Sequence, residues 1–333
     1  MKKNLLILSL VILAFSCGDK GSNTPDPPKP PEPGNEMIPM NSLVFKSGVW
    51  AMHRPAEVTA FENARGAKLD IIAGFVAREA WANMQSSWYM NEQSIPAGFK
   101  GTMNIAMPLW PENGSLDAAA RGDYNAEWEK LGRNIATRYP DAYLRPGWEM
   151  NIKNMYWHAT PENKDKWIEA FRHASTNLRK GSDKFKICWV VNFGPGQTGT
   201  EDARIFYPGN EYVDFIGFDV YDWWPAYTTP ERINAHKTAT YGWDWWLAFA
   251  KEKGKKFVIP EWGVVNPDVP NSAYGGDNPR FIQFAYNWMR ENKDWMEMEC
   301  YFANKSDIRS ELFTTRNPQA LAEYKAWMPK LKK

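Results

Sequence analysis

Cysteine and histidine are scarce in this 333-residue sequence, which holds three cysteines and four histidines. The histidines are scattered and no Cys/His cluster has zinc spacing, so we expect no metal. A GxGxxG motif and a phosphate-binding loop are also missing, and we expect no organic cofactor. Cys188 and Cys300 lie in apolar, strand-like runs. This favours buried free thiols, with a single disulfide in an exported chain as the alternative.

The sequence also lacks a block of charge of one sign. Its formal net charge is +1, from 40 Lys and Arg against 39 Asp and Glu. Proteins that hold nucleic acid or an acidic polymer by bulk charge carry a basic patch or stripe. We therefore expect no nucleic-acid partner for this chain, and we expect a monomer.

No apolar run near the N-terminus is long enough for a permanent membrane span. Met-Lys-Lys is followed by an apolar stretch over residues 5–15 and then by Ser16 and Cys17. A basic start, a short apolar core and a small residue at the cut predict an export signal over residues 1–17. Residues 13–17 resemble a bacterial lipobox, in which Cys17 carries the lipid. We predict a lipoprotein at the bacterial outer membrane or cell surface, with an ordinary secretory signal as the alternative.

Residues 18–36 are rich in proline, glycine, serine and charge, which predicts a flexible tether. The remaining residues, 37–333, are ordinary in length for one α/β barrel domain. Short apolar runs that read as buried parallel strands lie at 48–52, 69–75, 102–107, 142–148, 185–191, 213–220, 256–260 and 298–302. Amphipathic helices are predicted at 125–139, 163–178, 244–252, 279–291 and 318–327. This alternation predicts a single (β/α)8 barrel, with a doubly wound sheet as the alternative.

Tryptophan is abundant, with 18 residues, many of them near predicted strand ends or in loops. A buried indole N–H needs a partner, so a core uses few tryptophans, whereas the apolar faces of sugar rings stack on flat aromatic rings. The enrichment favours carbohydrate binding. The alternative is that about half of these residues belong to the core.

Two glutamates close apolar strand-like runs and are the strongest functional signal. Glu149 follows the run 142–148, and Glu261 follows the run 256–260. Active sites of (β/α)8 barrels lie at the carboxyl ends of the strands. Cleavage of a glycosidic bond uses two carboxyl groups there, one as proton donor and one as nucleophile or base. The alternative, a salt-bridged or surface glutamate at each strand end, is weaker because both glutamates adjoin tryptophan in apolar sequence.

Side chains two residues apart in a strand share a face, which groups further residues with this pair. Arg145 shares the parity of Glu149, and Asp219 and Tyr221 share a parity in the sixth strand. An inward Arg145 would pair with a carboxylate and fix its position. Glu261 beside Tyr221 and Arg145 suits the nucleophile, and Glu149 suits the acid, whose pKa its surroundings should raise.

Three motifs resemble glycoside hydrolase family 26 in order and spacing over most of the mature domain. They are Arg-Pro-Gly-Trp-Glu-Met-Asn at 145–151, Val-Asp-Phe-Ile-Gly-Phe-Asp-Val-Tyr-Asp-Trp-Trp at 213–224 and Phe-Val-Ile-Pro-Glu-Trp-Gly at 257–263. The resemblance implies a retaining barrel enzyme with Glu149 as acid/base and Glu261 as nucleophile. It also implies that Tyr221 lies near the nucleophile and that Trp157 belongs to an aromatic wall after the fourth strand.

The best-known activity of that family is endo-β-1,4-mannanase, and some relatives cut β-1,3-xylan or mixed-linkage β-glucan. The chain departs from the mannanase pattern, because Gly147-Trp148 stands where His usually precedes the acid/base, and Ile152 stands where Gly is usual. The indole N–H only donates, so Trp148 cannot bind a sugar as His does. We expect a polysaccharide hydrolase with mannan as the default substrate. The alternative of another class is a glycan-binding protein on a decayed barrel.

Further substrate contacts are predicted around the two glutamates. His53 follows the first strand and is a candidate donor or a structural residue, and Trp110 and Trp262 are candidate stacking platforms. Asn192, at the end of the fifth strand, is a candidate contact or a turn cap. Asp219 would contact substrate or pair with Arg145. The predicted substrate-binding residues are Arg145, Trp148, Asn151, Trp157, Tyr221, Trp262, Trp110, His53, Asp219 and Asn192, and the segments 77–99 and 265–278 are predicted to wall the cleft.

Overall fold

The structure is a computed structural model that describes residues 36–86, 94–269 and 271–333. The predicted export signal, the predicted lipidation site Cys17 and residues 18–35 of the predicted tether lie outside the described residues. In the described part of the chain, no helix combines the length and the apolar character that a membrane span requires.

Eight strands form a closed parallel barrel in chain order, and β8 pairs with β1 to complete the ring. They are β1 (Lys46–Trp50), β2 (Ile71–Phe75), β3 (Thr102–Met107), β4 (Tyr143–Pro146), β5 (Lys186–Asn192), β6 (Phe215–Tyr221), β7 (Lys256–Gly263) and β8 (Met296–Phe302). All six residues of β3 are buried, as expected for a strand covered on both faces. The predicted (β/α)8 barrel and the eight predicted strand positions are confirmed.

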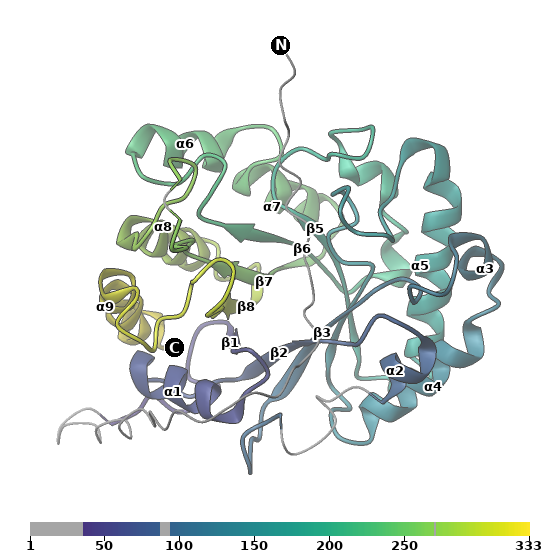
Figure 1. Cartoon of the computed structure of the whole chain (residues 1–333), viewed down its shortest axis with the longest axis horizontal. Coiled ribbons are helices and arrows are strands. Elements are labelled where there is room, and N and C mark those ends of the chain that lie inside the picture. The colour runs from purple at the N-terminus through teal and green to yellow at the C-terminus, as the bar shows by residue number, and fades with distance from the viewer. Residues whose placement is uncertain (1–35, 87–93, 270) are drawn as a thin grey trace. The chain divides into compact units, whose positions relative to one another are not determined.

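Helices surround the barrel on its outside (Figure 1). They are α1 (Pro55–Arg65), α2 (Trp81–Gln85), α3 (Leu116–Arg121), α4 (Asn125–Ala136), α5 (Lys164–Leu178), α6 (Pro230–Thr238), α7 (Trp243–Glu252), α8 (Pro279–Glu291) and α9 (Pro318–Trp327). The stripe predicted for α4 is buried at Trp128, Leu131 and Ile135. The five predicted helices are present, and α1, α2, α3 and α6 are additional. Helix α6 buries none of its residues, so it has no apolar stripe that a pattern search could find.

The fourth and seventh strands end differently from the prediction. Strand β4 stops at Pro146, because Gly147 and Glu149 have left-handed backbone angles, with φ of 63° and 52°. The turn nevertheless stays bonded to the sheet, since Glu149 N–H donates to the carbonyl of Val190 at 3.0 Å. Strand β7 continues to Gly263, so Glu261 lies inside it and not after it. Glu149 is therefore presented by a tight turn and Glu261 by the strand itself.

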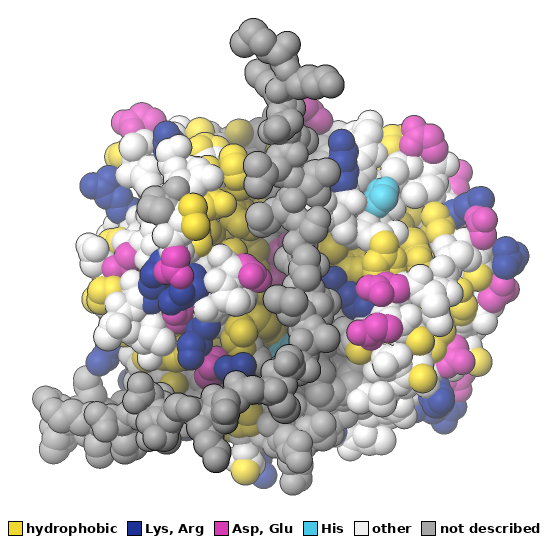
Figure 2. Space-filling model, in the orientation of Figure 1, with side chains coloured by type: hydrophobic (Ala, Val, Ile, Leu, Met, Phe, Trp, Pro, Cys, Tyr) yellow, Lys and Arg dark blue, Asp and Glu magenta, His cyan; other side chains and the backbone are white. Residues whose placement is uncertain are grey.

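Cys188 and Cys300 are buried free thiols, as predicted, and no disulfide joins them. Burial raises the pKa of both thiols. Acidic and basic side chains are interspersed over the described part of the face in Figure 2, with hydrophobic side chains visible between them. This mixed surface agrees with the near-zero net charge of the chain.

Candidate active site

Glu261 is held by a cation and a hydroxyl group inside the barrel mouth. Arg145 Nη2 lies 2.8 Å from Glu261 Oε1, and the Tyr221 hydroxyl donates to Glu261 Oε2 at 3.0 Å. Arg145 is completely buried and also pairs with Asp219, whose Oδ2 lies 3.0 Å from its Nη1. One guanidinium thus bridges two carboxylates and fixes the direction of Glu261. The structure brings together Arg145, Asp219, Tyr221 and Glu261 as their strand parity predicts.

Glu149 lies in a different environment, without a cation in direct contact among the described residues. Its carboxylate accepts a hydrogen bond from Asn192 Nδ2 at 2.7 Å, and only 7% of the residue is exposed. Burial, and after it the charge of Glu261, raise the pKa of Glu149 to about 7, against the lowering effects of Asn192, Arg145 and Arg78. Glu149 is therefore protonated in a large fraction of molecules at neutral pH, as a general acid must be.

Asn192 owes its position to Asn151. The Asn151 side chain donates to the backbone carbonyl of Asn192 at 2.8 Å and accepts from its backbone N–H at 2.8 Å. These two bonds link the turn that carries Glu149 to the end of β5. Asn151 is almost fully buried and holds Asn192 in place. Its place among the substrate-binding residues stays a prediction.

Arg78 is a site residue that the sequence reasoning missed. Its guanidinium lies over the rings of Trp148 and Trp157, at 5.1 Å and 5.3 Å from their centroids. It interacts electrostatically with both Glu149 and Glu261, and burial lowers the pKa of Arg78. Arg78 follows β2, on the same mouth of the barrel, but one arginine in a loop carries no motif. It lies in the segment 77–99 that is predicted to wall the cleft, but nothing in the sequence distinguishes it from its neighbours there.

Four predicted aromatic contacts are buried and have little ring surface for a sugar. Trp157 is fully buried and donates to the carbonyl of Trp148 at 2.8 Å, while Trp148 packs against Trp157 with centroids 4.3 Å apart. Trp262 is also fully buried, with its N–H 2.7 Å from Glu299 Oε2 on the outer side of the barrel. Trp110 is buried too. This burial does not suit the stacking roles predicted for Trp110 and Trp262, whereas Trp157 lies in an aromatic cluster after β4 and Trp148 supports Arg78.

His53 lies beside β1 and pairs with Trp50. The indole N–H of Trp50 donates to His53 Nε2 at 2.7 Å, and burial lowers the pKa of His53 to about 3. His53 is therefore neutral at all ordinary pH values. Trp50 stacks on Phe302 at 4.1 Å, so these rings line the mouth near β1 and β8. The role of His53 as a substrate donor stays a prediction.

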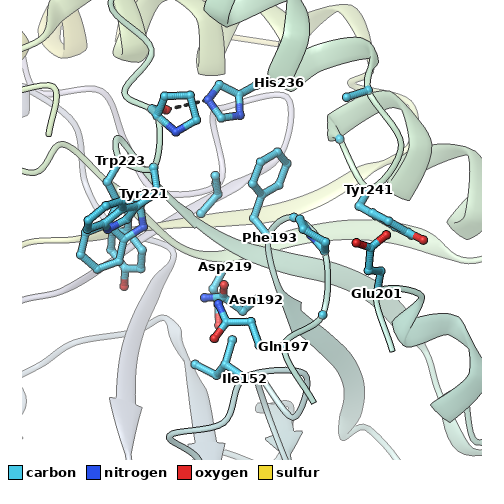
Figure 3. Close-up of a pocket in the computed structure, with 18 of the residues that line it drawn as sticks. Ile152, Asn192, Phe193, Gln197, Glu201, Asp219, Tyr221, Trp223, His236 and Tyr241 are labelled. Carbon is cyan, nitrogen blue, oxygen red and sulfur yellow. Dashed lines mark hydrogen bonds between the residues drawn. The ribbon is translucent and has the colours of Figure 1, made fainter. Parts of the chain in front are cut away.

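A cavity of about 900 Å³ adjoins the carboxylates over β5 and β6. Asn192, Asp219 and Tyr221 line its inner end, and His236 of helix α6 lies at the opposite end (Figure 3). The exposed Trp224 also lines this cavity. Within the described part of the chain, no cluster of His, Cys, Asp and Glu could hold a metal ion.

These features define a class of protein, a closed (β/α)8 barrel with two buried glutamates at its mouth and a cavity beside them. Comparisons with known proteins agree with this architecture. Residues 127–238 match the family described as Glycosyl hydrolase family 26. The catalytic domain of a family 26 endo-beta-1,4-mannanase from Bacillus sp. JAMB-750 superposes with a TM-score of 0.61 at 16% identity, over 86% of this chain and 85% of that one.

Three curated relatives share sequence with the chain, among them an endoglucanase and a β-1,3-xylanase. Endoglucanase H of Acetivibrio thermocellus is 22% identical over 294 residues, which cover 84% of this chain and 30% of that protein. Beta-1,3-xylanase TXYA of a Vibrio species is 27% identical over 128 residues, covering 37% of this chain and 24% of that protein. The chain thus spans less than a third of the length of these relatives. Together with the family match over residues 127–238, they confirm the resemblance to glycosyl hydrolase family 26.

Proposed function

We propose that the chain is a retaining, endo-acting β-glycoside hydrolase that cuts a polysaccharide by double displacement. The observation that carries the proposal is the contrast between its two glutamates. Glu261 faces a guanidinium and a hydroxyl donor, whereas Glu149 has a pKa raised to about 7. A nucleophile and a proton donor need these opposite surroundings.

In the first step, the Glu261 carboxylate attacks the anomeric carbon and forms a glycosyl ester. The bond from that carbon to the glycosidic oxygen breaks, and Glu149 transfers its proton to the departing oxygen. Arg145 and the Tyr221 hydroxyl orient Glu261 so that one carboxylate oxygen can point at the sugar. Glu149 ends this step as a carboxylate, which the hydrogen bond from Asn192 stabilises.

In the second step, Glu149 acts as a base. It takes a proton from a water molecule, whose oxygen attacks the anomeric carbon and releases Glu261 as a carboxylate. Glu149 is protonated again, so the cycle closes without a cofactor. Two inversions at the same carbon leave its configuration unchanged.

For the substrate, we propose β-1,4-mannan first, with β-1,3-xylan and mixed-linkage β-glucan as alternatives. Support for mannan comes from the likeness to the Bacillus mannanase structure and from a relative named Mannan endo-1,4-beta-mannosidase, whereas the endoglucanase and the xylanase are named for glucan and xylan hydrolysis. We retain β-1,3-xylan and mixed-linkage β-glucan as alternatives because Trp148 replaces the usual His, and its buried ring offers the sugar no hydrogen-bond acceptor.

We also propose that the protein is exported and anchored by lipid at Cys17, on the strength of the signal and lipobox pattern in residues 1–17. Metabolic labelling with a radioactive fatty acid tests this. Label should enter the wild-type protein and be lost in Cys17→Ser, and equal labelling of both would contradict the anchor.

The activity is tested by incubating the protein with galactomannan, glucomannan, β-1,3-xylan, mixed-linkage β-glucan and arabinoxylan. Glu149→Gln and Glu261→Gln serve as paired variants, and ¹H NMR follows the anomeric configuration of the first products. We expect one polymer to be cut with retention by the wild type and by neither variant. If the wild type cuts none of them but binds one, the chain is a glycan-binding protein.

A further inference from the structure

The cavity beside the carboxylates is lined by segments that follow the neighbouring strands β4, β5 and β6. Ile152 and Asn154 come from the turn after Glu149, Phe193 and Gln197 follow β5, and Trp223 and Trp224 follow β6. None of its lining residues comes from β7, β8, β1 or the loops that follow them. The cavity therefore starts at the hydrogen-bond partners of both glutamates, with Ile152 and Asn154 on its Glu149 side, and we refer to it below as the β5–β6 groove.

The side walls of the groove are aromatic. In Figure 3, Tyr221 and Trp223 lie on one side, Tyr241 and Glu201 lie on the other, and Phe193 lies between them. Tyr221 and Trp223 contact each other with ring centroids 5.5 Å apart. Flat rings on facing walls match the apolar C–H faces of pyranose rings, and the volume of about 900 Å³ is at the upper end of the ~300–1,000 Å³ usual for ligand sites.

Trp224 is the aromatic residue of the groove that is most open to solvent, with 66% of its surface exposed. Its backbone N–H donates to the carbonyl of Ala273 at 3.1 Å. The Tyr274 ring lies edge-to-face with its ring, with centroids 6.2 Å apart. Its φ of 51° is unusual for a bulky side chain, so the surrounding loop must hold it in place. Trp223, Trp224 and Tyr274 thus form a contiguous aromatic surface at the groove, and such a surface indicates a binding site.

The charges of the groove favour a neutral ligand. Arg232 is the one guanidinium among the lining residues, and Glu201 and Asp219 are acidic. Burial lowers the pKa of His236, which is therefore neutral at pH 7. A groove that binds uronic acids or sulfated sugars would need several basic side chains to pair with the carboxylate or sulfate groups of those sugars.

We propose that the β5–β6 groove binds neutral pyranose units on the leaving-group side of the cleaved bond, with Trp224 as their principal stacking platform. This inference rests on the proposed function, because the side is assigned from the role of Glu149. The acid donates its proton to the leaving-group oxygen, so the leaving sugar lies beside it. Asn192, which donates a hydrogen bond to Glu149, lines the start of the groove.

The test measures binding apart from catalysis. Mannohexaose, cellohexaose and β-1,3-xylohexaose are titrated calorimetrically into Glu149→Gln, alone and combined with Trp224→Ala, Trp224→Phe or Ile205→Ala. Ile205 is a matched control, since it is 40% exposed and does not line the groove. We expect one hexasaccharide to bind, an affinity loss of about tenfold or more with Trp224→Ala, partial recovery with Trp224→Phe and no change with Ile205→Ala. Polygalacturonate should not bind.

A second readout separates this inference from the proposed function. With Glu149 intact, Trp224→Ala should lower kcat/KM for the hexasaccharide about tenfold more than kcat/KM for an aryl glycoside of the same sugar, whose leaving group is small. Equal losses on both substrates, unchanged hexasaccharide binding, or no binding of any hexasaccharide would overturn the groove assignment. If the wild type hydrolyses nothing but Trp224→Ala still loses affinity, the groove stands and the catalytic proposal fails.

Discussion

The buried carboxyl group of Glu149 makes the stability of the fold depend on pH, and Glu149→Gln should remove that dependence. Burial and the charge of Glu261 raise the pKa of Glu149 from its ordinary 4.5 to about 7. Between these two values the native state holds a proton that the unfolded chain has released. The contribution of Glu149 to stability therefore falls as the pH rises from 4.5 through 7, and it does not recover above that range.

The size of the effect follows from the shift. One pKa unit corresponds to about 1.4 kcal/mol, so an ionised Glu149 destabilises the native state by about 3 kcal/mol above pH 7. Glutamine has nearly the same shape, carries no charge and still offers a carbonyl oxygen to Asn192. We expect Glu149→Gln to exceed the wild type in the free energy of unfolding by about 3 kcal/mol at pH 8 and to match it near pH 4.

Urea unfolding at pH 4, 5, 6, 7 and 8 measures this difference, with Glu211→Gln as a control at an exposed glutamate. The control should follow the wild-type curve. The reasoning about Glu149 is refuted if the difference between Glu149→Gln and the wild type is the same at every pH, or if it grows toward pH 4. A gain in stability on loss of the proposed acid would also show that the site is strained for function.

Two further predictions concern the groups around Glu149, and the pH dependence of kcat/KM checks both. Asn192→Ala removes a hydrogen bond to the charged form of Glu149, so the pKa of Glu149 should rise by about one unit. The basic limb of the profile should then move to higher pH, and a downward move would contradict the assignment of Glu149 as the acid. Arg78→Met removes a positive charge that lowers the pKa of Glu149. The basic limb of the kcat/KM profile should therefore also move to higher pH, and kcat/KM itself should fall about tenfold. Arg78→Lys keeps the charge and should leave the limb in place, and an equal shift in both variants would show that Arg78 acts only by packing.

The sequence predicted the strands because each is a short apolar run between polar segments, as a strand covered on both faces must be. It also predicted that Arg145, Tyr221 and Glu261 meet, since strand parity and chain order determine which side chains enter the barrel. Helix α6 could not be found in this way, because it buries no residue and has no apolar stripe. The turn at Gly147 was missed for a related reason, since its left-handed backbone leaves no periodic trace in the sequence.

The tryptophans that were predicted to contact substrate but are buried show what composition alone fails to predict. Trp262 follows Glu261 in β7, so the alternation that turns Glu261 inward turns Trp262 outward to the helix layer, where it meets Glu299. The same parity rule, applied to the neighbouring residue, would have excluded Trp262 as a platform. For Trp157 no such rule was available, because it lies in an irregular loop. Composition alone cannot distinguish a tryptophan that packs in the core from one, such as Trp224, that faces solvent.

The pairing of Trp148 with Arg78 distinguishes this site from the mannanase pattern. In the mannanase pattern, a His at this position can both donate and accept a hydrogen bond. Here the Trp148 ring is 2% exposed and lies beneath the guanidinium of Arg78, so the polar group presented at this point is Arg78. A guanidinium only donates, and it stays charged. We therefore expect Arg78 to meet sugar oxygens only as acceptors at this point, where the His of the mannanase pattern offers both roles.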